Sequence, residues 1–160
     1  NYLAHLIPID KHFNDLMEMQ TTLHTHVTDG TGMDKEALLQ YLKGEKLLIQ
    51  NKLSEAITVF ANMRVNQPTS NITETAAVRE IFSRLQLGQT AELKQPLQWL
   101  NESNDGDKGL VLSGEIAEFI DHDTQAALGY YEQLLQNYPK SLLVEPIRQH
   151  IREIRSNQES

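Results

Sequence analysis

A helix–turn–helix pattern over residues 42–68 constrains the fold of this chain more than any other feature of the sequence. Small or apolar residues recur there at gaps of three and four, which places them on one face of each of two helices. They are Gly44, Leu47, Leu48, Ala56, Ile57, Phe60 and Met63. Residues 50–52 are the predicted turn, and Pro68 follows the end of the second helix. Helices this short cannot bury their apolar face alone, so neighbouring pairs must stack on them.

The sequence before this pair predicts two helices. A leading helix is expected over residues 8–27, with an apolar seam that consists of Ile9, Phe13, Leu16, Leu23 and Val27. A glycine-containing breaker at 28–32 follows, and the next helix is expected over 35–49, where it forms the first half of the pair described above.

The sequence after the pair predicts further short helices. We expect the first of them to be capped by Thr73 and ended by Gly88. Pro96 should kink or delay the next, and Pro146 suits the first turn of the last. These later helices are expected over about 91–100, 110–120, 124–137 and 144–155, with 101–109 as the clearest loop. The predicted fold class is therefore all-α, in a single domain over residues 1–160.

Three segments, 37–70, 71–104 and 108–141, share one layout. The first and third carry a glycine, an alanine, an aromatic residue and a proline in the same order: Gly44, Ala56, Phe60 and Pro68, then Gly114, Ala127, Tyr131 and Pro139. The third copy has one extra residue, which we expect in the turn at 121–123. The middle copy is degenerate, with Gly88, Leu93, Leu97 and Leu100 in the corresponding places. This layout resembles the tetratricopeptide repeat, a helix–turn–helix unit of about 34 residues.

The resemblance implies a right-handed superhelix of about three repeats, whose concave face binds a peptide or protein segment. Carried over by position, the groove residues would be Tyr41, Glu45, Leu48, Val78, Phe82, Gln86, Lys108, Val111, Glu115 and Glu118. Repeats of this family that clamp a C-terminal carboxylate use Lys, Asn and Arg at these places. Tyr41, Glu45 and Glu115 argue against that specificity here, and an apolar, acidic groove favours a basic or amphipathic partner.

The C-terminal stretch also resembles the last repeat and capping helix of bacterial, often envelope-associated, tetratricopeptide proteins. Those proteins commonly carry an alanine where this chain has Pro146, so the capping helix over 144–155 departs from the pattern at its start. The resemblance implies a periplasmic or envelope location. Since the sequence starts at Asn1 without a methionine, it is compatible with a processed form, and an upstream targeting segment, anchor or further repeat would not be seen.

Composition excludes several classes of function. The formal net charge of −8 argues against a phosphate-binding surface, and so against a nucleic-acid partner. Because the chain has no cysteine, it has no disulfide, thiolate metal site or cysteine nucleophile. No apolar run is long enough to span a bilayer. We expect no cofactor.

Few residues suggest reactive chemistry. The loop at 101–112 has oxygen side chains at alternate places, but Leu112 stands where a calcium loop needs a bidentate glutamate. Glu115 and Glu118 lie three apart on one helix face, where a carboxylate pair is possible, although such glutamates are usually solvated surface. The spacing of His150 suggests no partner for it.

The sequence therefore predicts a non-enzymatic scaffold for protein–protein interaction, with Tyr41 and Phe82 as apolar anchors. Two alternatives stay open. The repeats could belong to a longer solenoid used as a spacer or for self-association into a homo-oligomer. An enzyme that uses Glu115 and Glu118 is a remote third possibility.

Overall fold

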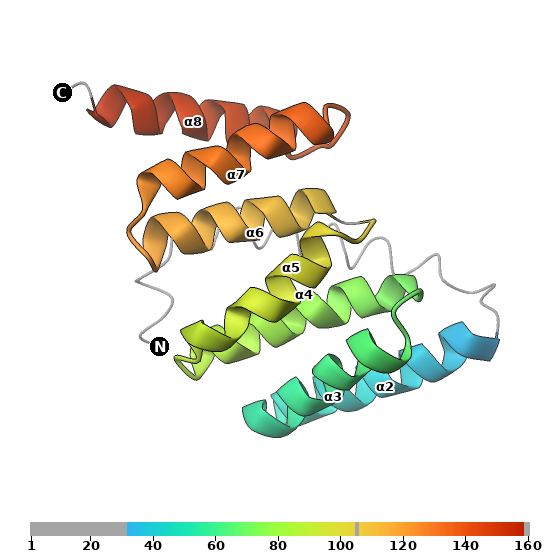
Figure 1. Cartoon of the computed structure of the whole chain (residues 1–160). Coiled ribbons are helices and arrows are strands. Elements are labelled where there is room, and N and C mark those ends of the chain that lie inside the picture. The colour runs from blue at the N-terminus through green and yellow to red at the C-terminus, as the bar shows by residue number, and fades with distance from the viewer. Residues whose placement is uncertain (1–31, 105, 159–160) are drawn as a thin grey trace. The chain divides into compact units, whose positions relative to one another are not determined.

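The computed structural model describes residues 32–104 and 106–158, and the expected leading helix over 8–27 lies outside them. The described residues form only helices, without a strand, which confirms the all-α class (Figure 1). The elements are α2 (Gly32–Ile49), α3 (Leu53–Asn66), α4 (Asn71–Gln86), the 3-10 helix η2 (Thr90–Leu93), α5 (Lys94–Asn101), α6 (Gly106–Phe119), α7 (Thr124–Asn137) and α8 (Val144–Gln158). The chain divides between Pro96 and Leu97 into two compact units, called unit 1 and unit 2 below.

Unit 1 is built on the predicted helix pair, α2 and α3, with α4 packed against both. Its core contains small and apolar residues of all three helices: Ala37, Tyr41, Ala56, Phe60, Met63, Ile72 and Ala76. Phe60 is fully buried against Gly44, and a Cβ atom at Gly44 would overlap its ring. Glycine is therefore needed at position 44 so that α2 can approach α3 closely.

Unit 2 repeats this arrangement in α6 and α7, and α8 packs on α7. A Cβ atom at Gly114 would overlap the fully buried ring of Tyr131, as at Gly44 and Phe60. The core of this unit consists of Leu110, Val111, Ala117, Ala127, Leu128, Tyr131, Leu134, Ile147, Ile151 and Ile154. Ile147, Ile151 and Ile154 thus form the inward face of α8, and the arginines of this helix are exposed.

The two predicted turns are confirmed, and they differ in length as expected. Between α2 and α3 the chain reverses through Asn51, whose φ of 58° is left-handed, and Lys52 N–H donates to Leu47 O at 2.9 Å. The turn between α6 and α7 has one residue more and uses His122 at φ 56°. Asp123 then caps α7, because its Oδ1 accepts from Ala126 N–H at 2.9 Å.

Two local predictions are wrong. Ser70 precedes α4 at the N-cap position, whereas the Thr73 hydroxyl lies inside the helix and donates to Gln67 O at 2.7 Å. The expected loop at 101–109 is shorter than predicted, because α6 already begins at Gly106. Gly106 and Gly109 were interpreted as loop residues, but a Cβ at either would overlap Asn101. Close packing against the end of α5, within unit 2, is what these glycines provide.

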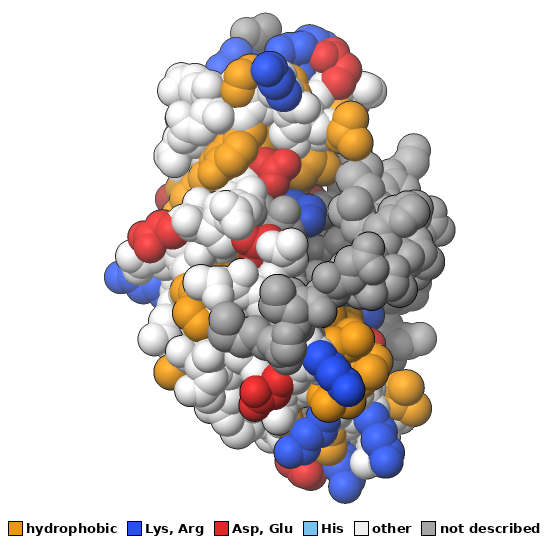
Figure 2. Space-filling model, turned by 90° about the vertical axis from the view of Figure 1, so that its right-hand side faces the viewer, with side chains coloured by type: hydrophobic (Ala, Val, Ile, Leu, Met, Phe, Trp, Pro, Cys, Tyr) orange, Lys and Arg blue, Asp and Glu red, His pale blue; other side chains and the backbone are white. Residues whose placement is uncertain are grey.

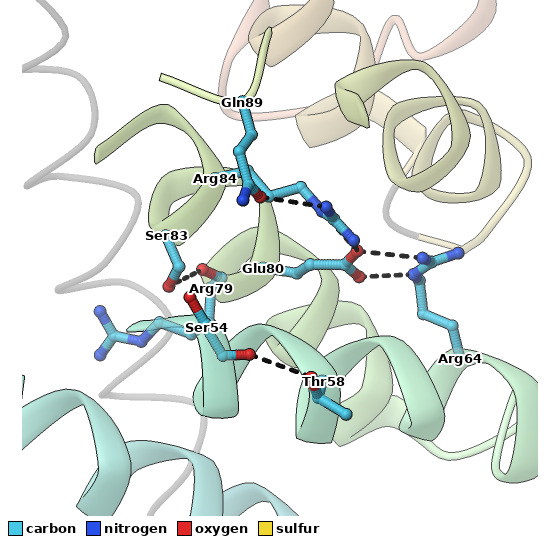
Figure 3. A network of polar contacts seen from close by, with 8 residues as sticks. All are labelled: Ser54, Thr58, Arg64, Arg79, Glu80, Ser83, Arg84 and Gln89. Atoms are coloured by element: carbon cyan, nitrogen blue, oxygen red, sulfur yellow. Dashed lines mark hydrogen bonds and ion pairs between the residues drawn. The ribbon is translucent and has the colours of Figure 1, made fainter. Parts of the chain in front are cut away.

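A buried ionic network fastens α4 to α3 (Figure 3). Glu80 is fully buried, and its carboxylate accepts from Arg64 Nε at 2.7 Å and Nη2 at 3.1 Å. Arg84, one turn later on α4, donates from Nε at 2.9 Å. Charges taken out of water cost free energy unless they are paired and hydrogen-bonded. The Glu80 carboxylate meets both conditions, because Arg64 and Arg84 each carry a positive charge and donate hydrogen bonds to it. No sequence pattern predicted the network.

Candidate functional site

An ion pair joins the helices that carry the groove residues predicted for the first and second repeats. Arg79 Nε on α4 lies 2.7 Å from Glu45 Oε1 on α2, and Arg79 Nη2 lies 3.3 Å from Glu45 Oε2. Both side chains are about a quarter exposed, at 28% and 26%. Figure 3 shows Arg79 pointing away from Glu80, so it takes no part in the buried network.

Three further residues share this side of the two helices. Leu48 lies one turn after Glu45, and Phe82 lies one turn after Arg79; both are half-buried, and Gln86 is exposed. We call the surface formed by Glu45, Leu48, Arg79, Phe82 and Gln86 the α2–α4 surface. It combines two partly accessible apolar side chains with a fixed pair of opposite charges.

The other two groove residues predicted for unit 1 belong to its interior. Tyr41 is 8% exposed, and its ring centroid lies 5.9 Å from that of Phe60. Burial raises the pKa of the Tyr41 hydroxyl above its ordinary value. Val78 is 4% exposed. In this structure Tyr41 supports the core, and Phe82 is the more accessible of the two expected anchors.

In unit 2 the predicted groove residues lie on α6. Val111 is buried in the core of the unit, and Lys108 is half-buried. Glu115 is 5% exposed, and the side chain of Glu118 is 14% exposed. The interpretation of these two glutamates as solvated surface is therefore wrong.

Glu118 connects three helices of unit 2, α6, α7 and α8. Its Oε2 accepts from the Tyr131 hydroxyl on α7 at 3.0 Å and lies 2.8 Å from His150 Nε2 on α8. The Tyr131 and His150 rings also meet edge to face, with centroids 5.5 Å apart. The hydrogen bond to Glu118 raises the pKa of His150, and burial raises the pKa of the Tyr131 hydroxyl. The contact with Glu118 thus favours the protonated form of His150 in the folded state.

Glu115 lies one turn before Glu118, deeper in the unit. Burial raises its pKa to about 8, against an ordinary value of 4.5; the nearby charge of His150 opposes this shift and that of Glu118 adds to it. Glu115 therefore holds its proton at neutral pH. Glu115 is therefore neutral, and the carboxyl group of Glu118 is paired with the His150 imidazole. Neither glutamate presents an unpaired negative charge.

Three residues of these arrangements were missed by the sequence reasoning: Arg79, the hydroxyl of Tyr131, and His150. A usable signal exists for Arg79, because it follows Glu45 by 34 residues, the expected repeat length. His150 follows Glu118 by 32 residues, close to that length, and lies on α8. A search for acidic and basic residues about one repeat length apart in the sequence would have paired Glu45 with Arg79 and Glu118 with His150.

Comparison with known proteins assigns the chain to no family, and two negative findings concern the described residues. Among those residues, no three His, Asp or Glu side chains come together as metal ligands. None of the described helices is long and apolar enough to cross a membrane. No family model matches the chain, and no curated protein or solved structure shows a match to it.

Proposed function

We propose that this chain is a tetratricopeptide-like scaffold that binds a protein or peptide segment on the α2–α4 surface. The observation that carries the proposal is a pair of contacts at a separation of 34 residues. Glu45 pairs with Arg79 in unit 1, and in unit 2 the Ser141 hydroxyl donates to Asp107 Oδ2 at 2.6 Å. Equivalent positions of successive repeats are expected to touch at this separation when helix pairs stack.

The glycine–aromatic pairs support the same proposal. Gly44 with Phe60 and Gly114 with Tyr131 set the approach of the two helices in two separate copies. A helix pair held at this close approach is the unit that tetratricopeptide-like scaffolds repeat, so its occurrence in two separate copies supports the assignment to that class.

The charges on the described surfaces indicate an amphipathic partner. Glu45 is neutralised by Arg79, Glu118 is paired with His150, and Glu115 is protonated at neutral pH. A basic ligand would therefore find little uncompensated charge at these positions. Leu48 and Phe82 offer apolar area instead, with Glu45 and Arg79 beside them to fix the orientation of a polar backbone or side chain.

A peptide-display screen on the immobilised full chain tests this proposal. Peptides selected by the chain should be amphipathic, and the double variant Leu48→Ala with Phe82→Ala should weaken their binding by about tenfold or more. The control is Val65→Ala, which shortens an apolar side chain at a 74% exposed position on α3, outside the α2–α4 surface. Equal affinity for all three proteins would refute the assignment of the α2–α4 surface.

A further inference from the structure

α8 is held less firmly than its neighbours α6 and α7. It contributes Ile147, Ile151 and Ile154 to the core of unit 2, but it contacts α7 much less than α7 contacts α6. Most of its other residues are exposed, and basic and acidic side chains lie next to one another at the top of Figure 2. A helix with few buried apolar contacts is where local opening starts.

His150 is the half-buried polar residue through which α8 meets α6. Its Nε2 lies 2.8 Å from Glu118 Oε2, and its ring meets that of Tyr131 on α7 edge to face. Arg155 Nη2 on α8 also pairs with Glu132 Oε1 on α7 at 2.7 Å, but these side chains are 57% and 46% exposed. Exposed ion pairs contribute little because water screens them. The charge of His150 is therefore the one that can change how α8 is held.

The ionisable groups around His150 are acidic. Glu115 and Glu118 act on it from α6, the Tyr131 hydroxyl belongs to α7, and Glu153 on α8 itself has its Oε2 4.0 Å from His150 Nδ1. The side chain of Glu153 is 60% exposed and therefore solvated, whereas Glu115 is 5% exposed. A protonated His150 thus supplies the positive charge that balances the carboxyl groups of α6.

A rise in pH removes this balance in two steps. His150 loses its positive charge, and Glu115 gains a negative charge one turn away from Glu118, where both burial and the neighbouring carboxyl group oppose ionisation. The raised pKa of His150 and that of Glu115, about 8, place both steps above pH 6.5. An ionised Glu115 is stable only in contact with water, so alkaline pH favours an opening that admits water to this site.

α6 and α7 are held together by contacts that carry no charge. The ring of Tyr131 is fully buried against Gly114, and leucines of both helices lie in the same core. The loop before α8 is also fixed, because the Ser141 hydroxyl donates to Asp107 Oδ2 on α6 at 2.6 Å. Movement of α8 away from α6 is therefore the opening that brings water to Glu115 with the smallest loss of apolar contacts.

We propose that α8 is a pH-sensitive covering helix of unit 2. At neutral pH the contact between His150 and Glu118 holds it on α6 and α7, and at alkaline pH it detaches while α6 and α7 stay paired. Detachment exposes the isoleucines of α8 and the apolar residues of α7 that they cover, so the chain presents this apolar surface only at alkaline pH. The proposal does not depend on the α2–α4 surface, because that surface belongs to unit 1.

Hydrogen exchange of the full chain at pH 6.5, 7.5, 8.5 and 9, corrected for the intrinsic exchange rate at each pH, tests the opening directly. The protection of the α8 amides should fall by about tenfold or more over this range, because the stabilisation from His150 is present below its ordinary pKa and is lost as pH rises through the folded value. At pH 9 the α8 amides should be at least about tenfold less protected than those of α6 and α7. Equal protection of the three helices at pH 9 would mean that unit 2 opens as a whole and would overturn the proposal, and so would a protection of α8 that does not change with pH.

Two substitutions in the same cluster assign the opening to its charges. Glu115→Gln together with His150→Gln removes both ionising groups, so the protection of α8 should change by less than about twofold between pH 6.5 and 9. The control is Glu132→Gln, which breaks the exposed ion pair with Arg155 and should keep the pH profile of the wild type. A fall of about tenfold in the double variant, or its loss in the control, would refute the role of Glu115 and His150. The measurements on the wild-type chain stay decisive if the double variant does not fold.

Discussion

Replacement of Glu115 by glutamine should make the protein more stable, and increasingly so as the pH rises. In the folded state the carboxyl group of Glu115 is buried in unit 2 beside Glu118, and its pKa is raised to about 8. In the unfolded state the group ionises near its ordinary value of 4.5. Between these two values the folded protein holds a proton that the unfolded protein has lost, so the free energy of unfolding falls as pH rises.

The magnitude follows from the two pKa values. One proton contributes a slope of about 1.4 kcal/mol per pH unit, which amounts to about 3 kcal/mol between pH 5 and pH 8 and levels off above that range. A domain of this size has a total stability of about 5–15 kcal/mol, so the effect is large. Glutamine has a similar shape and stays neutral, so the two proteins should be almost equally stable at pH 5.

Urea denaturation at pH 5, 6, 7, 8 and 9 measures this difference. His150 also has a raised pKa, and its stabilisation is present below its ordinary pKa and lost as pH rises through its folded value. That loss occurs in both proteins and largely cancels in the comparison. Glu92→Gln, at an exposed position of unit 1, is the control and should parallel the wild type. If the profiles of wild type and Glu115→Gln also ran parallel, the buried protonated carboxyl would be refuted.

Three further changes test the packing by urea denaturation at fixed pH. Gly44→Ala should lower the free energy of unfolding by about 1–3 kcal/mol, because the new methyl group overlaps the aromatic ring of α3. Gly129→Ala, in open space on α7, should raise it by about 0.5–1 kcal/mol. Equal effects of the two changes would contradict the close approach of α2 to α3 at Gly44. Glu80→Gln leaves two arginines without their buried carboxylate and should lower the free energy of unfolding by about 3 kcal/mol. Glu145→Gln, which removes one partner of an exposed ion pair, should lower it by less than about 1 kcal/mol. Asp123→Ala removes the N-cap of α7 and should cost about 1 kcal/mol, and no change would mean that the cap is replaced by water.

The helices and their inward faces could be predicted because periodicity is a local property. The glycine and the aromatic residue stand at matching positions in the sequence of two copies, and in the structure each ring lies against the glycine of its own copy. The polar contacts could not be predicted in the same way. Whether Glu115 faces solvent or the core depends on which helices cover α6, and the same periodic pattern allows both. Glu80 meets two arginines only after the crossing of α3 and α4 is fixed.

Glycine also misled the prediction for a physical reason. Gly106 and Gly109 sit in a polar stretch, where glycine usually marks a turn. In the structure they lie in the first turn of α6, where the absence of a side chain admits Asn101. Sequence alone does not separate a glycine that bends the backbone from one that admits a neighbour, because both roles depend on the missing Cβ.

The division of the chain into two units falls where the repeat signature is weakest, and the residues explain why. One repeat length after Gly44 stands Val78, and one repeat length after Phe60 stands Lys94. At this strict spacing the middle segment has neither the glycine nor the aromatic ring of its neighbours, because its Gly88 stands ten residues after the glycine position. Its second helix, α5, spans only Lys94–Asn101, after the 3-10 turn η2, because Pro96 cannot donate a backbone hydrogen bond. This short second helix contacts α4 much less than α3 contacts α2 or α7 contacts α6, and the boundary between Pro96 and Leu97 lies inside it. Gly44 and Gly114 thus mark the two helix pairs around which the chain forms compact units, and the segment that lacks such a pair is where those units separate.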